Sequence, residues 1–235
     1  MKILSIDTSS GVASAAVVEE EKLVCEVVLN NKLTHSQTLM PMIDYVLKES
    51  GTDISEIDLI AVANGPGSFT GLRIGVSAAK GMADALNKPV AGVSTLAAMA
   101  YNIPFCEYAI VPIMDARRSQ VYNAVYKWNK DELNEIASPR AISLEELLNE
   151  LKATGEKAVF LGDGVPVHKE TIIRELGENA LFAPVCSNAQ RASAVASAAR
   201  KMYERGETTD GIGLVPVYLR KSQAEREAEE KKQNK

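Results

Sequence analysis

The residues with the clearest capacity for chemistry form a glycine-rich segment that follows an apolar run. The segment is Asn64-Gly65-Pro66-Gly67-Ser68-Phe69-Thr70-Gly71-Leu72-Arg73-Ile74-Gly75. It predicts a tight turn between a strand and a helix capped by Ser68, where free N–H groups and the helix dipole favour an anion. The segment lacks the lysine of GxxxxGK(S/T) and the spacing of GxGxxG. A phosphate site and a purely structural turn therefore both remain open.

Histidine and serine patterns give little support for hydrolysis. The chain has two histidines, His35 and His168, which are far apart in the sequence. It contains neither an HExxH motif nor a GxSxG elbow, so we predict no metal ligands and no catalytic residue. His35 stands near the start of a predicted helix. It either bonds a loop or a partner, or is a half-buried histidine satisfied by backbone.

Composition and charge limit the partners of the chain. The 235 residues are 46% hydrophobic and 24% charged, with a formal net charge of −5. These values are typical of a globular protein and lack the basic surplus that binding to a phosphate backbone demands. No apolar run approaches the length of a membrane span, and a charge comes too early for a signal peptide. We therefore expect a cytoplasmic protein with no membrane partner.

The elements that would position these residues alternate in a regular order. In the first half, hydrophobic patterns and turn residues predict strands at residues 3–8, 12–18, 23–29, 58–63 and 89–92, and helices at about 35–50, about 68–86 and from 94. Thr34 with Gln37 is a candidate capping box for the first helix. In the second half, strands are predicted at 108–115, 120–128 and 158–161, and helices at 143–155, 167–176 and 188–205.

The second half therefore repeats the first, and each half opens with a strand that ends in aspartate, Asp7 or Asp115. The sequence predicts an α/β fold with two lobes of the order βββαβαβα and mixed sheets. We assign residues 1–104 to the N-terminal lobe, 105–212 to the C-terminal lobe and 213–235 to a C-terminal segment. The mixed charges from residue 221 onward predict a frayed helix or a disordered end. Duplicated lobes of this kind characterise the fold shared by actin, hexokinase and the Hsp70 ATPase domain (the ASKHA fold).

Four motifs resemble the bacterial TsaB (YeaZ) family from end to end. They are Ile6-Asp7-Thr8-Ser9, His35-Ser36-Gln37-Thr38-Leu39-Met40-Pro41, Gly65 to Gly75, and Pro216-Val217-Tyr218-Leu219-Arg220. The resemblance implies a subunit of the complex that installs threonylcarbamoyl on adenosine 37 of transfer RNAs. Its implied partners are the catalytic paralogue TsaD in a heterodimer and the ATPase TsaE through the TsaB–TsaD complex, while TsaC makes the threonylcarbamoyl-adenylate donor. The resemblance also implies a homodimer when TsaD is absent, and contact with tRNA only through the complex.

The resemblance also implies that this chain is not itself the enzyme. The catalytic paralogue binds its metal through two histidines four residues apart, and Thr95 and Met99 stand at about those positions here. A neutral hydroxyl and a soft thioether do not anchor a hard or borderline divalent ion. We therefore expect a non-catalytic scaffold that activates TsaD. The alternative is a stand-alone nucleotide-dependent transferase or kinase of the same fold.

A vestigial nucleotide site is the second expectation that comes from the fold. Asp7 and Asp115 compare with the aspartates that organise metal and phosphate in ATPases of this fold, and the turn Gly162-Asp163-Gly164 lies where such relatives hold adenosine. Either aspartate is equally suited to capping its own turn. Arg117 and Arg118 are the nearest cationic candidates, unless they belong to a solvated turn. We expect no resident cofactor and leave weak ATP or ADP binding open.

The third expectation is a partner interface on the two helices of the first half. The helix after the glycine turn carries a stripe of small residues at spacing i, i+4, i+8, and the preceding helix is apolar around more than one face. The predicted interface residues are Leu39, Met42, Ile43, Val46, Gly71, Ile74, Gly75, Ala78, Ala79 and Met82. In the alternative, both helices are sandwiched inside the lobe. If the interface is right, Gly75→Arg or Met42→Asp disrupts self-association and leaves the monomer folded.

Overall fold

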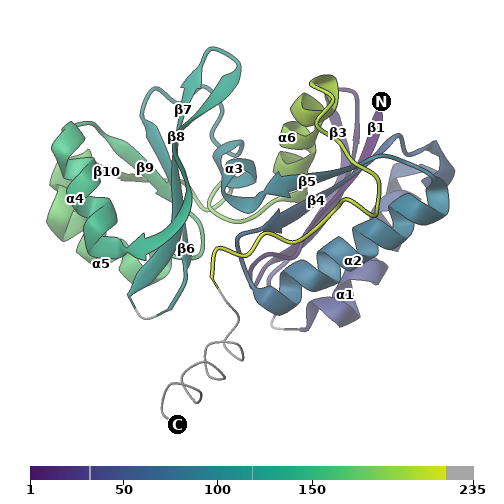
Figure 1. Ribbon diagram of the computed structural model, residues 1–235, viewed down its shortest axis with the longest axis horizontal. Helices are drawn as coiled ribbons and strands as arrows, with labels where there is room; N and C mark the ends of the chain where they lie inside the picture. Colours follow the sequence, from purple (N-terminus) through teal and green to yellow (C-terminus); the bar gives the residue numbers. More distant parts are fainter. Residues whose placement is uncertain (32, 118, 221–235) are drawn as a thin grey trace, which may run out of the picture.

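The computed structural model describes residues 1–31, 33–117 and 119–220 and consists of two lobes, each built on a five-stranded sheet (Figure 1). Arg118 and the charged tail from residue 221, for which we made predictions above, lie outside the described residues. The first lobe contains β1 (Lys2–Asp7), β2 (Ala13–Glu19), β3 (Lys22–Leu29), α1 (His35–Ser50), a short 3-10 turn (Ile54–Glu56), β4 (Leu59–Gly65), α2 (Phe69–Leu86), β5 (Val90–Ser94) and α3 (Thr95–Ala100). The second half contains β6 (Ala109–Asp115), β7 (Gln120–Asn129), β8 (Glu132–Ser143), α4 (Leu144–Thr154), β9 (Ala158–Leu161), α5 (Val165–Leu176), a 3-10 turn (Gly177–Asn179), β10 (Ala180–Phe182) and α6 (Ala192–Glu204).

The two sheets share one topology, which confirms the predicted duplicated α/β fold. The strand order is β3-β2-β1-β4-β5 in the first sheet and β8-β7-β6-β9-β10 in the second. In each sheet the first strand of the half pairs antiparallel with the second and parallel with the fourth. Helices connect the parallel strands, as parallel pairing requires. Within the described residues, no helix is long and apolar enough to cross a membrane.

The first sheet is buried on both faces. Leu4 and Ile6 of β1 belong to the apolar cluster beneath α1 and α2, whereas Ile3 belongs to the cluster beneath α6. Alternate residues of a strand point to opposite faces, so one strand serves both clusters. Helix α6 falls within the range that we assigned to the C-terminal lobe, yet it packs against β1, β2, β4 and β5 of the first lobe. Sequence order and packing therefore differ at this helix.

Several local predictions hold and others need correction. Helices α1 and α2 match the predicted ranges, and the Ser68 hydroxyl caps α2 as expected. The Ser143 hydroxyl caps α4 in the same way. The capping box at α1 does not form, because the Thr34 hydroxyl donates to the Gln37 side-chain oxygen and caps no backbone N–H. The pattern also did not mark β8 or β10 individually. Strand β8 is an edge strand with many exposed polar residues and a proline, which hides its periodicity.

The small-residue stripe of α2 packs against this chain itself. A Cβ built on Gly71 would lie 2.0 Å from the carbonyl oxygen of Thr8, and one on Gly75 would lie 2.4 Å from the Thr8 hydroxyl. The Thr8 hydroxyl donates to the Gly71 carbonyl at 2.7 Å. The glycines therefore allow the end of β1 to approach the helix. Gly75→Arg is then expected to disturb folding, which corrects the prediction that this variant leaves the monomer intact.

A pair of glycine substitutions in α2 tests this packing. Gly71→Ala should destabilise the chain by about 1–3 kcal/mol, because the added methyl group overlaps the Thr8 carbonyl. Gly81 lies in the same helix, and a methyl group added there would meet no atom within 4 Å. Gly81→Ala should therefore stabilise the chain by up to about 1 kcal/mol through helix propensity. Urea unfolding of both variants measures the difference. Equal effects of the two substitutions would show that Thr8 does not restrict this helix.

Candidate functional site

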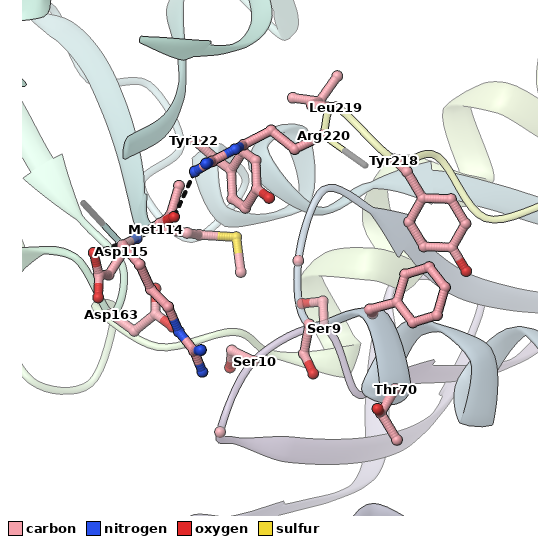
Figure 2. Close-up of a pocket in the computed structure, with 16 residues that line it drawn as sticks. Ser9, Ser10, Thr70, Met114, Asp115, Tyr122, Asp163, Tyr218, Leu219 and Arg220 are labelled. Atoms are coloured by element: carbon pink, nitrogen blue, oxygen red, sulfur yellow. Dashed lines mark hydrogen bonds between the residues drawn. The ribbon is translucent and has the colours of Figure 1, made fainter. Parts of the chain in front are cut away.

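A cavity of about 620 Å³ lies between the lobes beside the C-terminal segment (Figure 2). Its first-lobe wall comes from the β1–β2 turn and the start of α2, and carries the hydroxyl groups of Ser9, Ser10, Ser68 and Thr70. Its second-lobe wall comes from the ends of β6 and β9 and from β7, and carries Asp115, Arg117, Tyr122 and Asp163. Tyr218, Leu219 and Arg220 cover one side. The cavity is thus polar on both walls.

The glycine-rich segment at this cavity is engaged by the protein itself. A Cβ on Gly65 would lie 2.2 Å from the carbonyl oxygen of Val217, and one on Gly67 would lie 2.3 Å from that of Ser9. The Ser68 N–H donates to the Ser9 carbonyl at 2.7 Å, and the Gly71 N–H to the Ser68 hydroxyl at 3.3 Å. Two donors at the start of α2 are therefore used internally. This packing favours the structural turn over a phosphate site.

Asp7 lies beneath the cavity and does not line it. Its side chain is 1% exposed, and one carboxylate oxygen accepts from the N–H and the hydroxyl of Ser9 at 2.8 and 2.6 Å. The other oxygen is buried and has no hydrogen-bond partner among the described residues. Burial raises the pKa of Asp7 to about 6, and the Ser9 bonds and the charge of His35 oppose this rise. Asp7 thus caps its own turn in an environment that disfavours its charge.

The predicted nucleotide-site residues of the second lobe include two aspartates that line the cavity. Asp115 lines the cavity and accepts from the Arg117 N–H at 2.9 Å, so it also caps its turn. His168 of α5 brings its Nε2 atom to 3.9 Å from the Asp115 carboxylate. Asp163 retains access to the cavity, yet partial desolvation by the surrounding protein raises its pKa to about 6, helped by the negative charge of Asp115. Asp115 and Asp163 are therefore the two predicted nucleotide-site residues that reach the cavity.

The glycines beside Asp163 have a packing role. A Cβ on Gly162 would lie 2.3 Å from the carbonyl oxygen of Ile113, and one on Gly164 would lie 3.0 Å from it. The Gly164 N–H donates to the same carbonyl at 3.1 Å. Both glycines are buried. They bring the start of α5 close to β6 and do not face the cavity.

His35 bonds the turn that forms the first-lobe wall. Its Nε2 atom lies 2.6 Å from the Ser10 carbonyl oxygen, which only accepts, so this nitrogen carries the proton. This confirms the interpretation of a half-buried histidine satisfied by backbone. Thr95 and Met99 of α3 are 0% and 1% exposed, so both side chains are enclosed by the protein. Among the described residues, no group of three histidine, cysteine or carboxylate side chains has metal-binding geometry.

The ten predicted interface residues are mostly inside the first lobe. Leu39, Met42, Ile43, Val46, Gly71, Gly75 and Ala79 are buried against the sheet or the β1–β2 turn. They support the two helices and are not available to another chain, because this chain already covers them. Met42→Asp would consequently place a charge in the core and unfold the lobe. Ile74, Ala78 and Met82 are partly exposed, at the edge of the same cluster.

A partly exposed apolar strip runs along α1 and α2. The buried apolar stripe of α1 consists of Leu39, Met42, Ile43 and Val46. From the periodicity of the helix, Met40 and Leu47 lie at one edge of this stripe, and Tyr45 and Glu49 lie at the opposite edge. On α2, the Arg73 and Lys80 side chains donate hydrogen bonds to the C-terminal segment, so this side of the helix faces that segment. Ile74, Ala78 and Met82 lie on the other side of α2, toward α1. We call Met40, Leu47, Ile74, Ala78 and Met82 the α1–α2 surface.

Sequence reasoning did not include the C-terminal segment among the site residues. Tyr218 and Arg220 line the cavity, and the Arg220 guanidinium donates to the Ala116 carbonyl at 2.6 Å (dashed in Figure 2). The only signal in the sequence was the motif from Pro216 to Arg220, which identified a family but no contact. A hydrogen bond between residues more than a hundred positions apart leaves no mark in the local sequence pattern.

The two lobes of equal topology around a polar cleft have the actin- and hexokinase-like fold. The family model of TsaD, described as tRNA N6-adenosine threonylcarbamoyltransferase, matches residues 22–228. The tRNA threonylcarbamoyladenosine biosynthesis protein TsaB of Bacillus subtilis is 34% identical over 96% of both chains. The Escherichia coli protein of the same name is 31% identical over 95% of this chain and 96% of that one. The chain belongs to the TsaB family, within the wider group that the TsaD model describes.

A solved structure supports the same relationship. It is a Pseudomonas aeruginosa protein described as uncharacterized with similarity to peptidase YEAZ. At 30% identity it matches with a TM-score of 0.78 and covers 93% of this chain and 99% of that chain. The likeness therefore extends over both lobes.

The raised pKa of Asp7 predicts a specific pH dependence of stability. An unfolded aspartate has a pKa of about 3.9, so between about pH 4 and 6 the folded state binds more protons and stability falls as pH rises. Asparagine does not ionise, so the stability of Asp7→Asn should not fall in this way. The difference in free energy of unfolding, variant minus wild type, should therefore increase by about 3 kcal/mol from pH 4 to pH 7. Urea unfolding across this range measures it. Asp163→Asn should show a change in the same direction, because the pKa of Asp163 is also raised to about 6. A constant difference between Asp7→Asn and wild type would mean that Asp7 is ionised normally.

Proposed function

We propose that this chain is a non-catalytic subunit of the system that forms threonylcarbamoyladenosine at position 37 of tRNAs, and that it binds and activates TsaD. The observation that carries the proposal is the likeness to TsaB proteins over 96% of the chain. The α1–α2 surface supports the proposed binding of TsaD, because it is an apolar surface whose side chains are at least partly exposed. Met40 is 54% exposed. Methionines suit a surface that packs against more than one partner.

The proposed role does not require a bound nucleotide. Asp7 lies beneath Ser9, and the glycines that would cradle phosphate contact Ser9 and Val217. Tyr218 and Arg220 lie over the remaining cavity. These residues fit a resident nucleotide poorly, so we propose that the chain has no cofactor and at most weak affinity for ATP or ADP.

We infer the other partners from the α1–α2 surface and from the net charge of the chain. We propose that the chain forms a homodimer through the α1–α2 surface when alone, and that TsaD replaces the second copy. TsaE then joins through the TsaB–TsaD pair. With a net charge of −5, the chain contributes little to holding a polyanion, so tRNA binds through the complex.

Two exposed residues of α1 form a matched test of the surface. Met40→Asp should weaken binding to TsaD by at least about 30-fold, because a charge replaces an apolar side chain in the interface. Tyr45 is 50% exposed at the opposite edge of the buried stripe of the same helix, so Tyr45→Asp should leave affinity within about twofold. Titration calorimetry with purified TsaD measures both, and light scattering should show loss of the homodimer only for Met40→Asp. The surface is wrong if the two variants bind alike.

Reconstitution separates the scaffold from the enzyme. The chain alone, supplied with metal, ATP, threonylcarbamoyl-adenylate and tRNA, should form no modified nucleoside, whereas addition of TsaD and TsaE should restore formation. Mass spectrometry of digested tRNA is the measurement. Turnover by this chain alone would favour the alternative, a stand-alone nucleotide-dependent transferase or kinase. Asp163→Asn, in the cavity, would then be the first variant expected to lose activity.

A further inference from the structure

The C-terminal strap, residues 209–220, is anchored along the first lobe. Thr209 and Val90 exchange both backbone hydrogen bonds, at 2.8 and 3.0 Å. Leu214 is 2% exposed within the first core cluster. The Val217 N–H donates to the Asn64 carbonyl at 2.7 Å. In Figure 1 this yellow segment runs over α2 and β4 and then leaves the first lobe toward β6.

The strap is also bonded to the exposed side of α2. The Tyr218 ring stacks on Phe69 with centroids 4.7 Å apart, and the Arg73 guanidinium lies 3.9 Å from the centre of the same Phe69 ring. The Arg73 Nε atom donates to the Tyr218 hydroxyl at 3.1 Å. Arg73 is next to Ile74 of the α1–α2 surface, and both line a shallow hollow on α2. A molecule on this surface that also fills the hollow would reach Arg73.

One hydrogen bond carries the strap to the other lobe. It runs from the Arg220 guanidinium to the Ala116 carbonyl at 2.6 Å, in the β6–β7 turn. Among the residues that the structure describes, no other hydrogen bond joins the strap to the second lobe. The bond closes the cavity on the side where the strap passes (Figure 2).

Helix α3 links the two lobes. This helix lies between the lobes and packs against β4 and β5 on one side and β6 and β7 on the other (Figure 1). The cleft of about 620 Å³ is one hollow between the lobes, and a second hollow of about 750 Å³ is lined by α3, α6 and the β7–β8 hairpin. Tight packing resists deformation, whereas hollows between rigid bodies permit hinge movement. Besides the buried cluster around α3, the lobes are joined by the Lys201–Asp131 ion pair at 3.6 Å and, across the cleft, by the Arg220–Ala116 bond.

We propose that Arg220 is a latch that holds the cleft closed, and that contact of a partner with Arg73 releases it through Tyr218. A charged hydrogen bond of this kind shifts an equilibrium by roughly 10- to 100-fold, enough to set the population of open and closed lobes. The latch itself stands on the contacts above. Its control by a partner rests on the proposed function, in which TsaD occupies the α1–α2 surface.

Hydrogen exchange measured by mass spectrometry tests the latch in the isolated chain. Arg220→Ala should speed exchange in peptides covering residues 65–72 and 114–122, the two walls of the cleft, by at least about fivefold. The control is Arg174→Ala, an exposed arginine whose ion pair with Glu175 stays within α5, and it should leave these peptides unchanged. Unchanged exchange in Arg220→Ala overturns the proposal. The proposal is also overturned if exchange becomes faster at residues 209–217 in addition to the cleft walls. Arg220 would then hold the strap in place and would not control the cleft.

The connection to α2 has its own test. Arg73→Ala should reproduce part of the opening in the isolated chain, because it removes the bond to Tyr218. Added TsaD should open the 114–122 region of wild type and have no further effect there in Arg220→Ala. Control of the latch is refuted if Arg73→Ala exchanges like wild type, or if TsaD binds and the region stays closed. Failure of TsaD to bind would refute the proposed function instead, while the result for Arg220→Ala would still decide the latch.

Discussion

The approach of the β1–β2 turn to the start of α2 is the constraint on which the first lobe depends. Gly67 and Gly71 have no side chain where the carbonyls of Ser9 and Thr8 arrive, and any Cβ there would overlap them. The turn is then held by the Ser68 N–H and by His35. Because α1, α2 and the sheet all meet at this turn, it fixes how the helices lie and which of their sides remain exposed.

The duplicated lobe meets the same constraint with different residues. In both halves the helix after the fourth strand begins where the first strand ends, so glycine is needed at the junction. Gly162 and Gly164 leave room for the Ile113 carbonyl in the second lobe, as Gly67 and Gly71 leave room for those of Ser9 and Thr8 in the first. The glycines and aspartates that resemble a nucleotide site in sequence therefore have a packing explanation that applies to both lobes. That explanation does not depend on any ligand.

The sequence was sufficient to predict the fold. It was insufficient to predict what each helix packs against. Periodicity and caps are local, so the order of elements and the ranges of α1 and α2 could be predicted. The Gly71–Gly75 stripe correctly indicated close approach, but its pattern is the same whether Thr8 or another protein arrives. Helix α6 was predicted, yet nothing in its alanine-rich pattern indicates that it covers the first sheet. Contacts between residues distant in sequence, such as Arg220 with Ala116, are decided only by the assembled fold.

The distribution of buried and exposed groups separates rigid from adjustable parts of the molecule. Each sheet has its own apolar cluster beneath its helices. Between the lobes, α3 contributes a further apolar cluster with β6 and β7, and a hollow of about 750 Å³ lies beside it. A binding event on α2 does not alter the interior of either lobe, because the interior is close-packed. In the latch that we propose for Arg220, such an event alters the angle between the lobes, because the Arg220–Ala116 bond spans the cleft. A scaffold of this architecture would therefore transmit binding through lobe orientation and not through rearrangement of its core.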